Sequence, residues 1–474
     1  MKRWYWIVLA VVVLVAAGVT LVALPRAPEW TTSSPEALAE FEAGQAAQRK
    51  IYLNEAREHF KKAYELDPDF LAAKLRVARI FLEEDPDRAE LLFSELMTAD
   101  LSRLTAREKF FIEYWRANRN NQHEEATRLL DQCVERLPSD PYVLATKAGL
   151  AWAQGDLEDA ERLYQGLLAV DPNWVTAYNS LGYIKMMQEH FTEAEEHFKK
   201  YRYIAPDQAN PHDSLGELYI TIGRYEDAET TLERAIETKP DFWASYLHLA
   251  LLKAHARDFD SLYGLIERAR NEGIPDGVVF EMNCSTQFTE LADREAWQDI
   301  LEERGSECVE KYRLGRPSLI THRAACRMGD WEVAQKLEDD AAGALLEVER
   351  SGNDEAILIA QASTLHMQGV RLATQGDFDA AVERFRAVAD RLSFMMVEQG
   401  MFKLYNQLLE AETLLAAGKD SEAHKVIARV RGINPELVQE FQNNRFRYLG
   451  LGRGEAPIDT AAKQEETDGP MTAL

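Results

Sequence analysis

Residues 141–242 read PYVLATKAGLAWAQGDLEDAERLYQGLLAVDPNW, VTAYNSLGYIKMMQEHFTEAEEHFKKYRYIAPDQ and ANPHDSLGELYITIGRYEDAETTLERAIETKPDF, three consecutive blocks of 34 residues that align without gaps. Four block positions carry the same kind of residue throughout. Position 8 is Ala148, Gly182 or Gly216; position 20 is Ala160, Ala194 or Ala228; position 24 is Tyr164, Phe198 or Leu232; position 32 is Pro172, Pro206 or Pro240. A fixed period of this length indicates a repeat architecture.

Each recurring position has a physical role in a pair of antiparallel helices. Small residues at positions 8 and 20 let two helices approach closely, because a larger side chain would separate their axes. The bulky residue at position 24 is expected to fill the groove between neighbouring pairs. Proline at position 32 ends the second helix, and Gly155 or Gly223 supplies the left-handed conformation between the two helices. The pattern therefore predicts an all-α solenoid of stacked helix pairs.

The same frame extends to both sides of these blocks. It fits residues 37–70, 107–140, 362–395 and 404–437, is looser over 243–276, and is degenerate over 71–106 and 277–361. We therefore predict a repeat array over residues 37–276, degenerate helical repeats over 277–361 and further repeats over 362–449. Residues 450–474 lack periodicity and are predicted to be a disordered tail.

The pattern resembles the tetratricopeptide repeat (TPR) family, and the resemblance covers nearly all of residues 37–437. It implies a right-handed superhelix whose inner groove is lined by the first helix of each pair and binds segments of other proteins. Groove contacts in this family come mainly from repeat positions 2, 5, 9 and 12. The predicted protein-binding groove in this chain therefore comprises Tyr142, Trp152, Asn179, Tyr183, Met186, the adjacent Met187, Asn210, Asp213 and Glu217. Their aromatic rings and thioethers suit a peptide or an amphipathic helix, because such groups bury much area and adapt in shape.

A membrane segment is predicted before the repeats. Residues 4–24, WYWIVLAVVVLVAAGVTLVAL, are uncharged and span roughly 30 Å as a helix, enough to cross a bilayer. Lys2 and Arg3 favour a cytoplasmic stub at residues 1–3 and an extracytoplasmic repeat domain, periplasmic or outside the cell. The alternative is secretion after signal cleavage, but the run exceeds the usual apolar region and no small-x-small site follows. Residues 25–36 are predicted to be an extended linker.

A narrower resemblance involves TTSSPEALAEFEAG at 31–44 and LTAREKFFIEYW at 104–115. These stretches look like the sensor-like repeat regions that follow the membrane helix in bacterial transmembrane Ser/Thr kinases and CadC-type regulators. Those proteins carry a kinase or winged-helix domain before the span. Only residues 1–3 precede the span here, so the resemblance does not by itself imply a signalling role.

The composition and the motifs argue against nucleic-acid binding and catalysis. The net charge of −26 repels polyanions. Metalloprotease, phosphate-loop, hydrolase and dinucleotide motifs are absent from the sequence, so no enzyme activity, cofactor or metal is expected. His190 and His197 lie two helical turns apart, as do His248 and His255. No Cys or carboxylate completes a metal shell around either pair. We therefore expect these residues to be exposed helical histidines and not metal ligands.

The four cysteines lack zinc-ligand spacing. Cys133 and Cys284 fall at repeat positions that favour small buried residues. Cys308 and Cys326 are able to form a disulfide if the domain lies in an oxidising compartment, a question that the sequence leaves open.

These observations predict a membrane-anchored scaffold or adaptor that binds peptide or helical segments of partner proteins. The alternative is a sensory accessory subunit coupled to a kinase or a transcriptional regulator. A third reading is an enzyme subunit whose solenoid holds a separate catalytic chain. Partner identity and oligomeric state are not set by the sequence.

Overall fold

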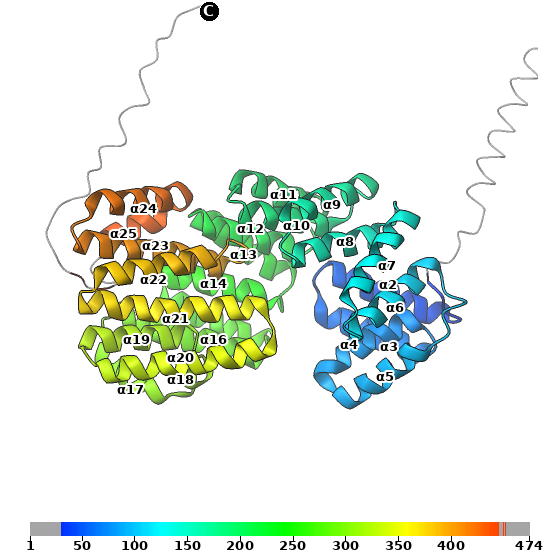
Figure 1. The fold of residues 1–474 in the computed structure, drawn as a ribbon, viewed down its shortest axis with the longest axis horizontal. Coiled ribbons are helices and arrows are strands. Elements are labelled where there is room, and N and C mark those ends of the chain that lie inside the picture. The colour runs from blue at the N-terminus through cyan, green and yellow to red at the C-terminus, as the bar shows by residue number, and fades with distance from the viewer. Residues whose placement is uncertain (1–29, 445–448, 450, 452–474) are drawn as a thin grey trace, which may run out of the picture. The chain divides into compact units, whose positions relative to one another are not determined.

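The computed structural model describes residues 30–444, 449 and 451. The predicted stub, the membrane segment at residues 4–24 and nearly all of the predicted tail lie outside these residues. Every regular element in the described part of the chain is a helix, which confirms the predicted all-α class. Among the described residues, no helix is both long and apolar enough to span a bilayer. The described residues divide into two compact units, unit 1 up to Val170 and unit 2 from Asp171 onwards (Figure 1).

The described residues of unit 1 form four antiparallel helix pairs. The pairs are α2 (Pro35–Arg49) with α3 (Leu53–Leu66), α4 (Leu71–Glu84) with α5 (Pro86–Thr98), α6 (Ala106–Arg119) with α7 (His123–Arg136), and α8 (Pro141–Ala153) with α9 (Leu157–Val170). Local signals explain where they begin. Pro141 opens α8 while the Asp140 side chain accepts hydrogen bonds from the next two main-chain N–H groups, and Thr105 and Glu108 form a capping box on α6. The stretch 71–106, degenerate in sequence, is a helix pair too.

Unit 2 continues the repeats and then adds longer helices. Its three regular pairs are α10 (Val175–Met187) with α11 (Phe191–Ile204), α12 (Asn210–Thr221) with α13 (Tyr225–Thr238), and α14 (Trp243–Ala256) with α15 (Phe259–Asn271). The helices that follow are α16 (Asp276–Asp293), α17 (Trp297–Glu302), the 3-10 turn η1 (Glu303–Gly305), α18 (Glu307–Lys311), α19 (Arg316–Met328), α20 (Trp331–Ser351), α21 (Asp354–Gln375), α22 (Phe378–Arg391), α23 (Val397–Ala416), α24 (Asp420–Ile433) and α25 (Pro435–Asn444).

Glycine at repeat position 8 is what permits the close helix pairing. A Cβ atom on Gly216 would lie 2.5 Å from Cγ of Leu232, and one on Gly369 would lie 2.7 Å from Cε1 of Phe385. The bulky residue at position 24 therefore packs on the glycine of its own pair. This corrects its predicted role in the groove between pairs, because its side chain fills the space inside its own pair.

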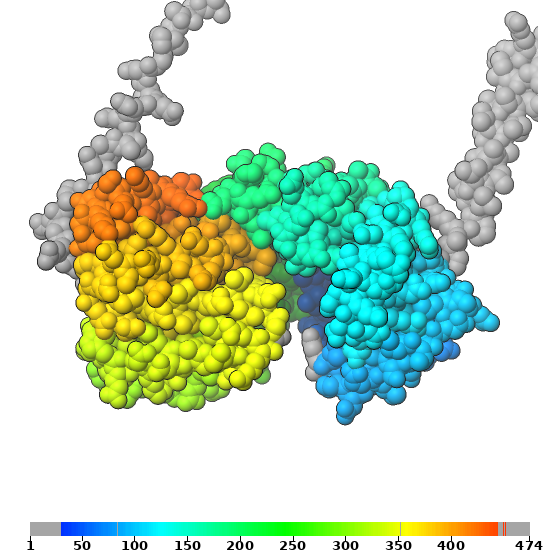
Figure 2. All heavy atoms as spheres, in the orientation of Figure 1, coloured from blue at the N-terminus to red at the C-terminus, as the bar shows by residue number. Residues whose placement is uncertain are grey.

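The C-terminal helices of unit 2 return to the middle of the array. Phe394, Val397 and Leu404 belong to the same buried apolar cluster as Leu215 and Leu218 of α12. Figure 2 shows the atoms of the C-terminal helices, in orange, against the green atoms of the preceding repeats. The inner face of α12, predicted to line an open trough, is consequently covered by the chain itself.

Candidate functional site

Helix α12 carries the polar centre of unit 2. All of its residues are buried, including the acidic Asp213 and Glu217. These two residues are four positions apart, so they lie on the same face of the helix. That face is directed at α14 and at the start of α23, which supply the remaining side chains of the site.

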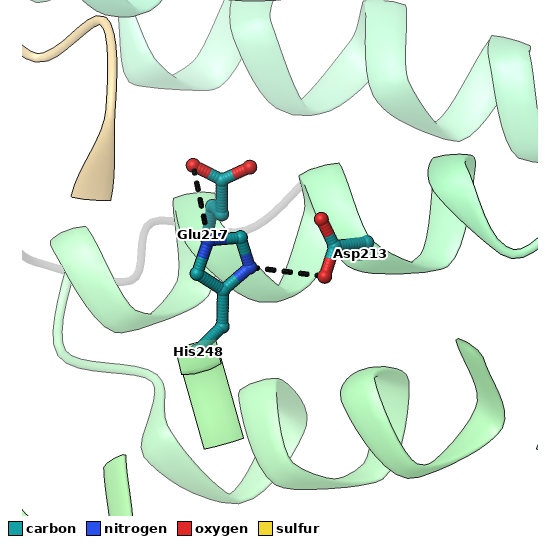
Figure 3. Close-up of side chains that lie close together, drawn as sticks. All are labelled: Asp213, Glu217 and His248. Atoms are coloured by element: carbon teal, nitrogen blue, oxygen red, sulfur yellow. Dashed lines mark hydrogen bonds and ion pairs between the residues drawn. The ribbon is translucent and has the colours of Figure 1, made fainter. Parts of the chain in front are cut away.

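Three carboxylates lie near the imidazole of His248, which comes from α14, and Figure 3 shows two of them, those of Asp213 and Glu217. Nδ1 of His248 is 2.9 Å from Oδ1 of Asp213. Its Nε2 is 4.0 Å from Oε2 of Glu217 and 3.6 Å from Oε1 of Glu398. The side chain of His248 is only 10% exposed, whereas that of Glu398 is 45% exposed. Glu398 therefore forms the solvent side of an otherwise buried cluster.

Neighbouring groups fix the carboxylates in place. The Ser245 hydroxyl donates to Oδ1 of Asp213 over 2.7 Å. The Tyr183 hydroxyl donates to Oε1 of Glu217 over 2.6 Å, and the main-chain N–H of Val397 donates to Oε2 over 3.3 Å. Glu217 is thus held by residues from α10 and α23, on opposite sides of α12 in the sequence.

The pKa values of His248 and Glu217 are both raised in this cluster. Burial alone would lower the pKa of His248, but the negative charges of Asp213 and Glu217 outweigh it and hold that pKa well above its usual range. Burial raises the pKa of Glu217 to about 7, opposed by the charge of His248. The rise in the pKa of His248 thus comes from neighbouring negative charge, whereas the rise in the pKa of Glu217 comes from its removal from water.

The structure gives the predicted groove residues several different environments. Met186, Asn210, Asp213 and Glu217 are buried, so an open groove lined by these four is not what the structure has. Met186 belongs to the apolar core. The Asn210 amide donates to the Tyr201 hydroxyl over 3.3 Å and therefore faces α11.

The other predicted groove residues of unit 2 are partly buried. Asn179 accepts a hydrogen bond from Ser214 over 2.8 Å, and the Tyr183 hydroxyl is engaged by Glu217. Met187 is partly buried at the end of α10. The structure therefore brings Asn179, Tyr183, Asp213 and Glu217 together around α12, joined by hydrogen bonds.

The two predicted residues of unit 1 lie on α8. The Tyr142 hydroxyl accepts a hydrogen bond from Nη1 of Arg49 over 3.2 Å, and the Arg107 guanidinium lies 4.8 Å from the centre of its ring. Trp152 is half-buried, and its ring is nearly perpendicular to that of Tyr164, with the two centroids 6.3 Å apart. Tyr142 is therefore occupied by contacts within unit 1, while Trp152 retains accessible surface.

Sequence reasoning missed His248 and Glu398 as members of the site. His248 was expected to be an exposed helical histidine without a carboxylate nearby, but it is buried among three carboxylates. One signal was available, because Asp213 and Glu217 occupy groove positions 5 and 9 of one repeat and His248 stands at position 6 of the next. No periodicity links Glu398 to this place.

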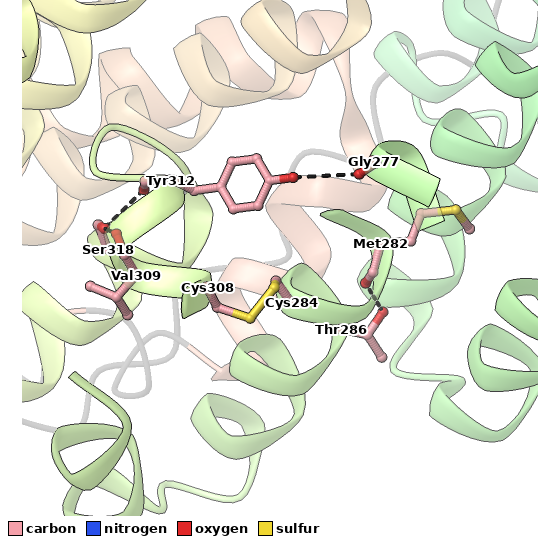
Figure 4. Close-up of a disulfide and its surroundings, with 8 residues drawn as sticks. All are labelled: Gly277, Met282, Cys284, Thr286, Cys308, Val309, Tyr312 and Ser318. Carbon is pink, nitrogen blue, oxygen red and sulfur yellow. Dashed lines mark hydrogen bonds between the residues drawn. A yellow bond between two sulfur atoms is a disulfide. The ribbon is translucent and has the colours of Figure 1, made fainter. Parts of the chain in front are cut away.

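The disulfide of the chain joins Cys284 of α16 to Cys308 of α18 (Figure 4). The pairing of Cys308 with Cys326, which the sequence left open, is not the one formed. Cys326 is a buried free thiol within α19, and Cys133 is a buried free thiol within α7. Cys284 was expected to be an unpaired small residue. Its short side chain is indeed buried, but α18 turns back towards α16 and brings Cys308 to it.

Comparison with known proteins identifies the repeats. Residues 117–182 and 185–254 match the tetratricopeptide repeat family model. A TPR repeat-containing protein of Pseudomonas aeruginosa is 28% identical over 179 residues, which are 36% of this chain and 29% of that protein. Human tetratricopeptide repeat protein 21B is 26% identical over 226 residues, 46% of this chain and 16% of that protein. The chain thus spans less than a third of the length of these relatives.

Solved structures of similar proteins include the APC/C hetero-tetramer Cut9-Hcn1. It aligns with a TM-score of 0.41 and 15% identity, covering 86% of this chain and 76% of that chain. Residues 117–182 and 185–254 thus match tetratricopeptide repeats in sequence, and they fold as the helix pairs that such repeats form.

Proposed function

We propose that this tetratricopeptide-repeat protein is a scaffold that binds a helical segment of a partner protein on the inner face of α8, without catalysis of its own. Tetratricopeptide repeats mediate protein–protein interactions. The observation that carries the proposal is the open space at Gly149. A Cβ atom on Gly149 would meet no atom within 4 Å, and Trp152 stands one helical turn further along.

The inner faces of the two units offer different access to a partner. At the same repeat position as Gly149, unit 2 has Glu217, which is buried beneath Val397. Because α23 begins on that inner face, the fold accepts a helix there. By analogy, we expect a helix of a partner protein to bind the inner face of α8. An apolar side chain of that helix would pack on the accessible ring of Trp152 and fill the space beside Gly149.

Site-specific crosslinking in intact cells tests this proposal. A photoreactive benzoylphenylalanine in place of Gly149 should capture a defined protein, and the same group in place of Gly264 should not capture it. Gly264 is the matched control because its surroundings are equally open, on α15. Trp152→Ala should abolish the crosslink at position 149, whereas Trp243→Ala, which removes a tryptophan that is 46% exposed, should leave it intact. Equal capture with Trp152→Ala would refute the proposal.

We further propose that residues 4–24 anchor the chain in a membrane, with the repeats on the extracytoplasmic side. The uncharged run and the preceding Lys2 and Arg3 support this topology. The Cys284–Cys308 disulfide supports it as well, because disulfides persist in oxidising compartments. A membrane-impermeant amine label should modify the repeats in cells whose outer barrier has been opened. Labelling only after complete lysis would contradict the topology, and a mature chain starting beyond residue 24 in the soluble fraction would indicate secretion instead.

A further inference from the structure

Three arginines on the first helices of unit 1 have no acidic partner among the described residues. Arg76 is partly buried and Arg79 is exposed, and both lie on one face of α4, because they are three positions apart. Neither guanidinium forms an ion pair or a hydrogen bond with a residue that the structure describes. Arg49, at the end of α2, donates from Nη1 to the Tyr142 hydroxyl over 3.2 Å and to no carboxylate of the described residues.

The second helices of the same unit pair their arginines with carboxylates. Nη1 of Arg57 on α3 is 3.5 Å from Oε1 of Glu84, and Nε of Arg128 on α7 donates to Oε2 of Glu125 over 2.7 Å. The chain has 80 acidic residues against 54 Lys and Arg, so carboxylates are abundant. The lack of a described carboxylate beside Arg76 is therefore a local feature of α4 and not a consequence of composition.

The guanidinium of Arg76 lies among aromatic groups. Its Cζ is 5.8 Å from the ring centre of Phe60 on α3. Burial lowers the pKa of Arg76 to about 10, the like charge of Arg79 lowers it further, and the Tyr142 phenol opposes both effects. A cation that is partly removed from water is costly unless a negative charge offsets it. An anionic group bound beside Arg76 would supply that charge.

Tyr142 connects these arginines to the surface of α8 that includes Gly149 and Trp152. Its hydroxyl is bonded to Arg49, and its phenol acts electrostatically on Arg76. Along α8, Gly149 follows Tyr142 by seven residues, which is about two helical turns and leaves both on one face. A helix that packs on Trp152 and Gly149 and continues towards Tyr142 therefore reaches the guanidinium groups.

We propose that Arg49, Arg76 and Arg79 form a cationic face that binds acidic side chains of the partner helix. This inference rests on the function proposed above, because it names the chemistry of the segment that binds α8. A guanidinium binds a carboxylate through two parallel hydrogen bonds, so Asp or Glu side chains suit this face. The chain as a whole carries a net charge of −26 and repels such a segment, which restricts its binding to the cationic face.

Binding of two matched peptides to the full chain tests the inference. The first is a fluorescent amphipathic helix with Leu along one face and Glu beside it, and the second has Gln in place of every Glu. The acidic peptide should bind about tenfold more tightly in fluorescence anisotropy, with an affinity that falls as salt is added. Equal affinities, tighter binding of the Gln peptide, or no binding of either peptide would overturn the proposal.

Two variants and a control identify the contact. Arg79→Glu, at an exposed position, should keep the fold, weaken binding of the acidic peptide about tenfold and leave the Gln peptide unaffected. Arg76→Gln should act in the same direction. Arg136→Glu, at an exposed arginine of α7, is the matched control and should bind both peptides as the wild type does. Unchanged affinity of Arg79→Glu and Arg76→Gln for the acidic peptide would refute the assignment of these arginines.

The crosslink at position 149 separates this inference from the function on which it rests. Capture that is equally strong in Arg79→Glu and in the wild type would keep α8 as the partner surface and overturn only the acidic segment. Absence of capture at position 149 in the wild type would instead reject the proposed function. Self-association of the wild type that Arg79→Glu abolishes, measured by sedimentation, would assign the cationic face to a second copy of the chain and overturn the proposal.

Discussion

The main-chain N–H of Val397 donates a hydrogen bond to Oε2 of Glu217 over 3.3 Å, although the two residues are 180 positions apart in the sequence. Glu217 stands on the inner face of a repeat, where this class of solenoid usually meets a partner. The contact shows that unit 2 uses that face for its own helix α23. Recognition of another protein is therefore expected on other surfaces of the chain.

Gly182→Ala should destabilise unit 2 markedly. A Cβ atom at this position would overlap the ring of Phe198, which is fully buried and has no room to move. Overpacking of this kind costs about 1–3 kcal/mol. Gly264→Ala on α15 is the control, because nothing lies within 4 Å of the added atom and alanine favours a helix. Urea unfolding should show a lower midpoint for Gly182→Ala alone, and equal midpoints for the two variants would contradict the packing described here.

Asn434→Ala should loosen the attachment of α25 to α12. The Asn434 side-chain amide donates to the carbonyl oxygens of Ile220 and Thr221, each over 3.1 Å, and its oxygen accepts from the N–H of Leu437 over 2.9 Å. Leaving these buried groups without a partner should cost about 2–4 kcal/mol in the free energy of unfolding.

Asn434→Asp separates the two roles of this side chain, because it keeps the oxygen that caps α25 but loses the amide that binds α12. We expect it to be at least as unstable as the alanine variant. Asn443→Ala, at an exposed position of α25, should behave as the wild type in the same thermal and urea measurements. A stable Asn434→Asp variant would show that the bonds to α12 contribute little.

Removal of the Cys284–Cys308 disulfide should lower the stability of unit 2 by about 3 kcal/mol, because the bond closes a loop of 24 residues. The double variant Cys284→Ala, Cys308→Ala should unfold at a lower urea concentration than the oxidised wild type. Dithiothreitol should lower the wild-type midpoint towards that of the double variant and leave the double variant unchanged. A reductant effect of equal size on both proteins would assign the stabilisation to something else.

Acid should destabilise unit 2 through His366. This histidine is buried on α21, bonded to Asn406 over 2.8 Å, and burial lowers its pKa to about 4. In the unfolded chain, His366 therefore binds a proton as the pH falls through about 6.5, whereas in the folded chain it does so only near pH 4. Stability is full above pH 6.5 and is lost as the pH falls towards 4, by up to about 3 kcal/mol from this group.

The variant His366→Gln should show a shallower loss of stability over the same pH range, in urea titrations at pH 7 and pH 5. His424→Gln, which changes an exposed histidine, is the control and should follow the wild-type curve. If His366→Gln and the wild type lose stability equally between these two pH values, the histidine does not carry the effect.

The local part of the fold was predictable because it depends on the spacing of a few residues. Gly182 and Phe198 are 16 positions apart, and their contact follows from one helix turning back on the next. The turn position occupied by Gly155 is left-handed in other repeats as well, even where it holds Glu189 or Arg257. The repeat frame thus imposes the backbone conformation on residues that do not favour it.

The site could not be predicted in the same way, because its contacts cross the repeat frame. Asp213 and Glu217 were recognised as inner-face residues, and the structure keeps them on that face. Their cover comes from Val397 and Glu398, which follow an irregular stretch after α22. No spacing in a single sequence relates those residues to α12, so the closure of the inner face and the burial of His248 were both missed.

The complete burial of α12 has a consequence for how the chain is made. Residues 210–221 leave the ribosome long before residues 394–441, whose side chains share the core with them. A solenoid with neighbour-only contacts can fold repeat by repeat during synthesis. Unit 2 cannot, because its central helix has no cover until residues 394–441 have been made. A transcript that ends before residue 394 would yield a chain in which α12 is exposed. Such a chain would associate with other chains or be degraded.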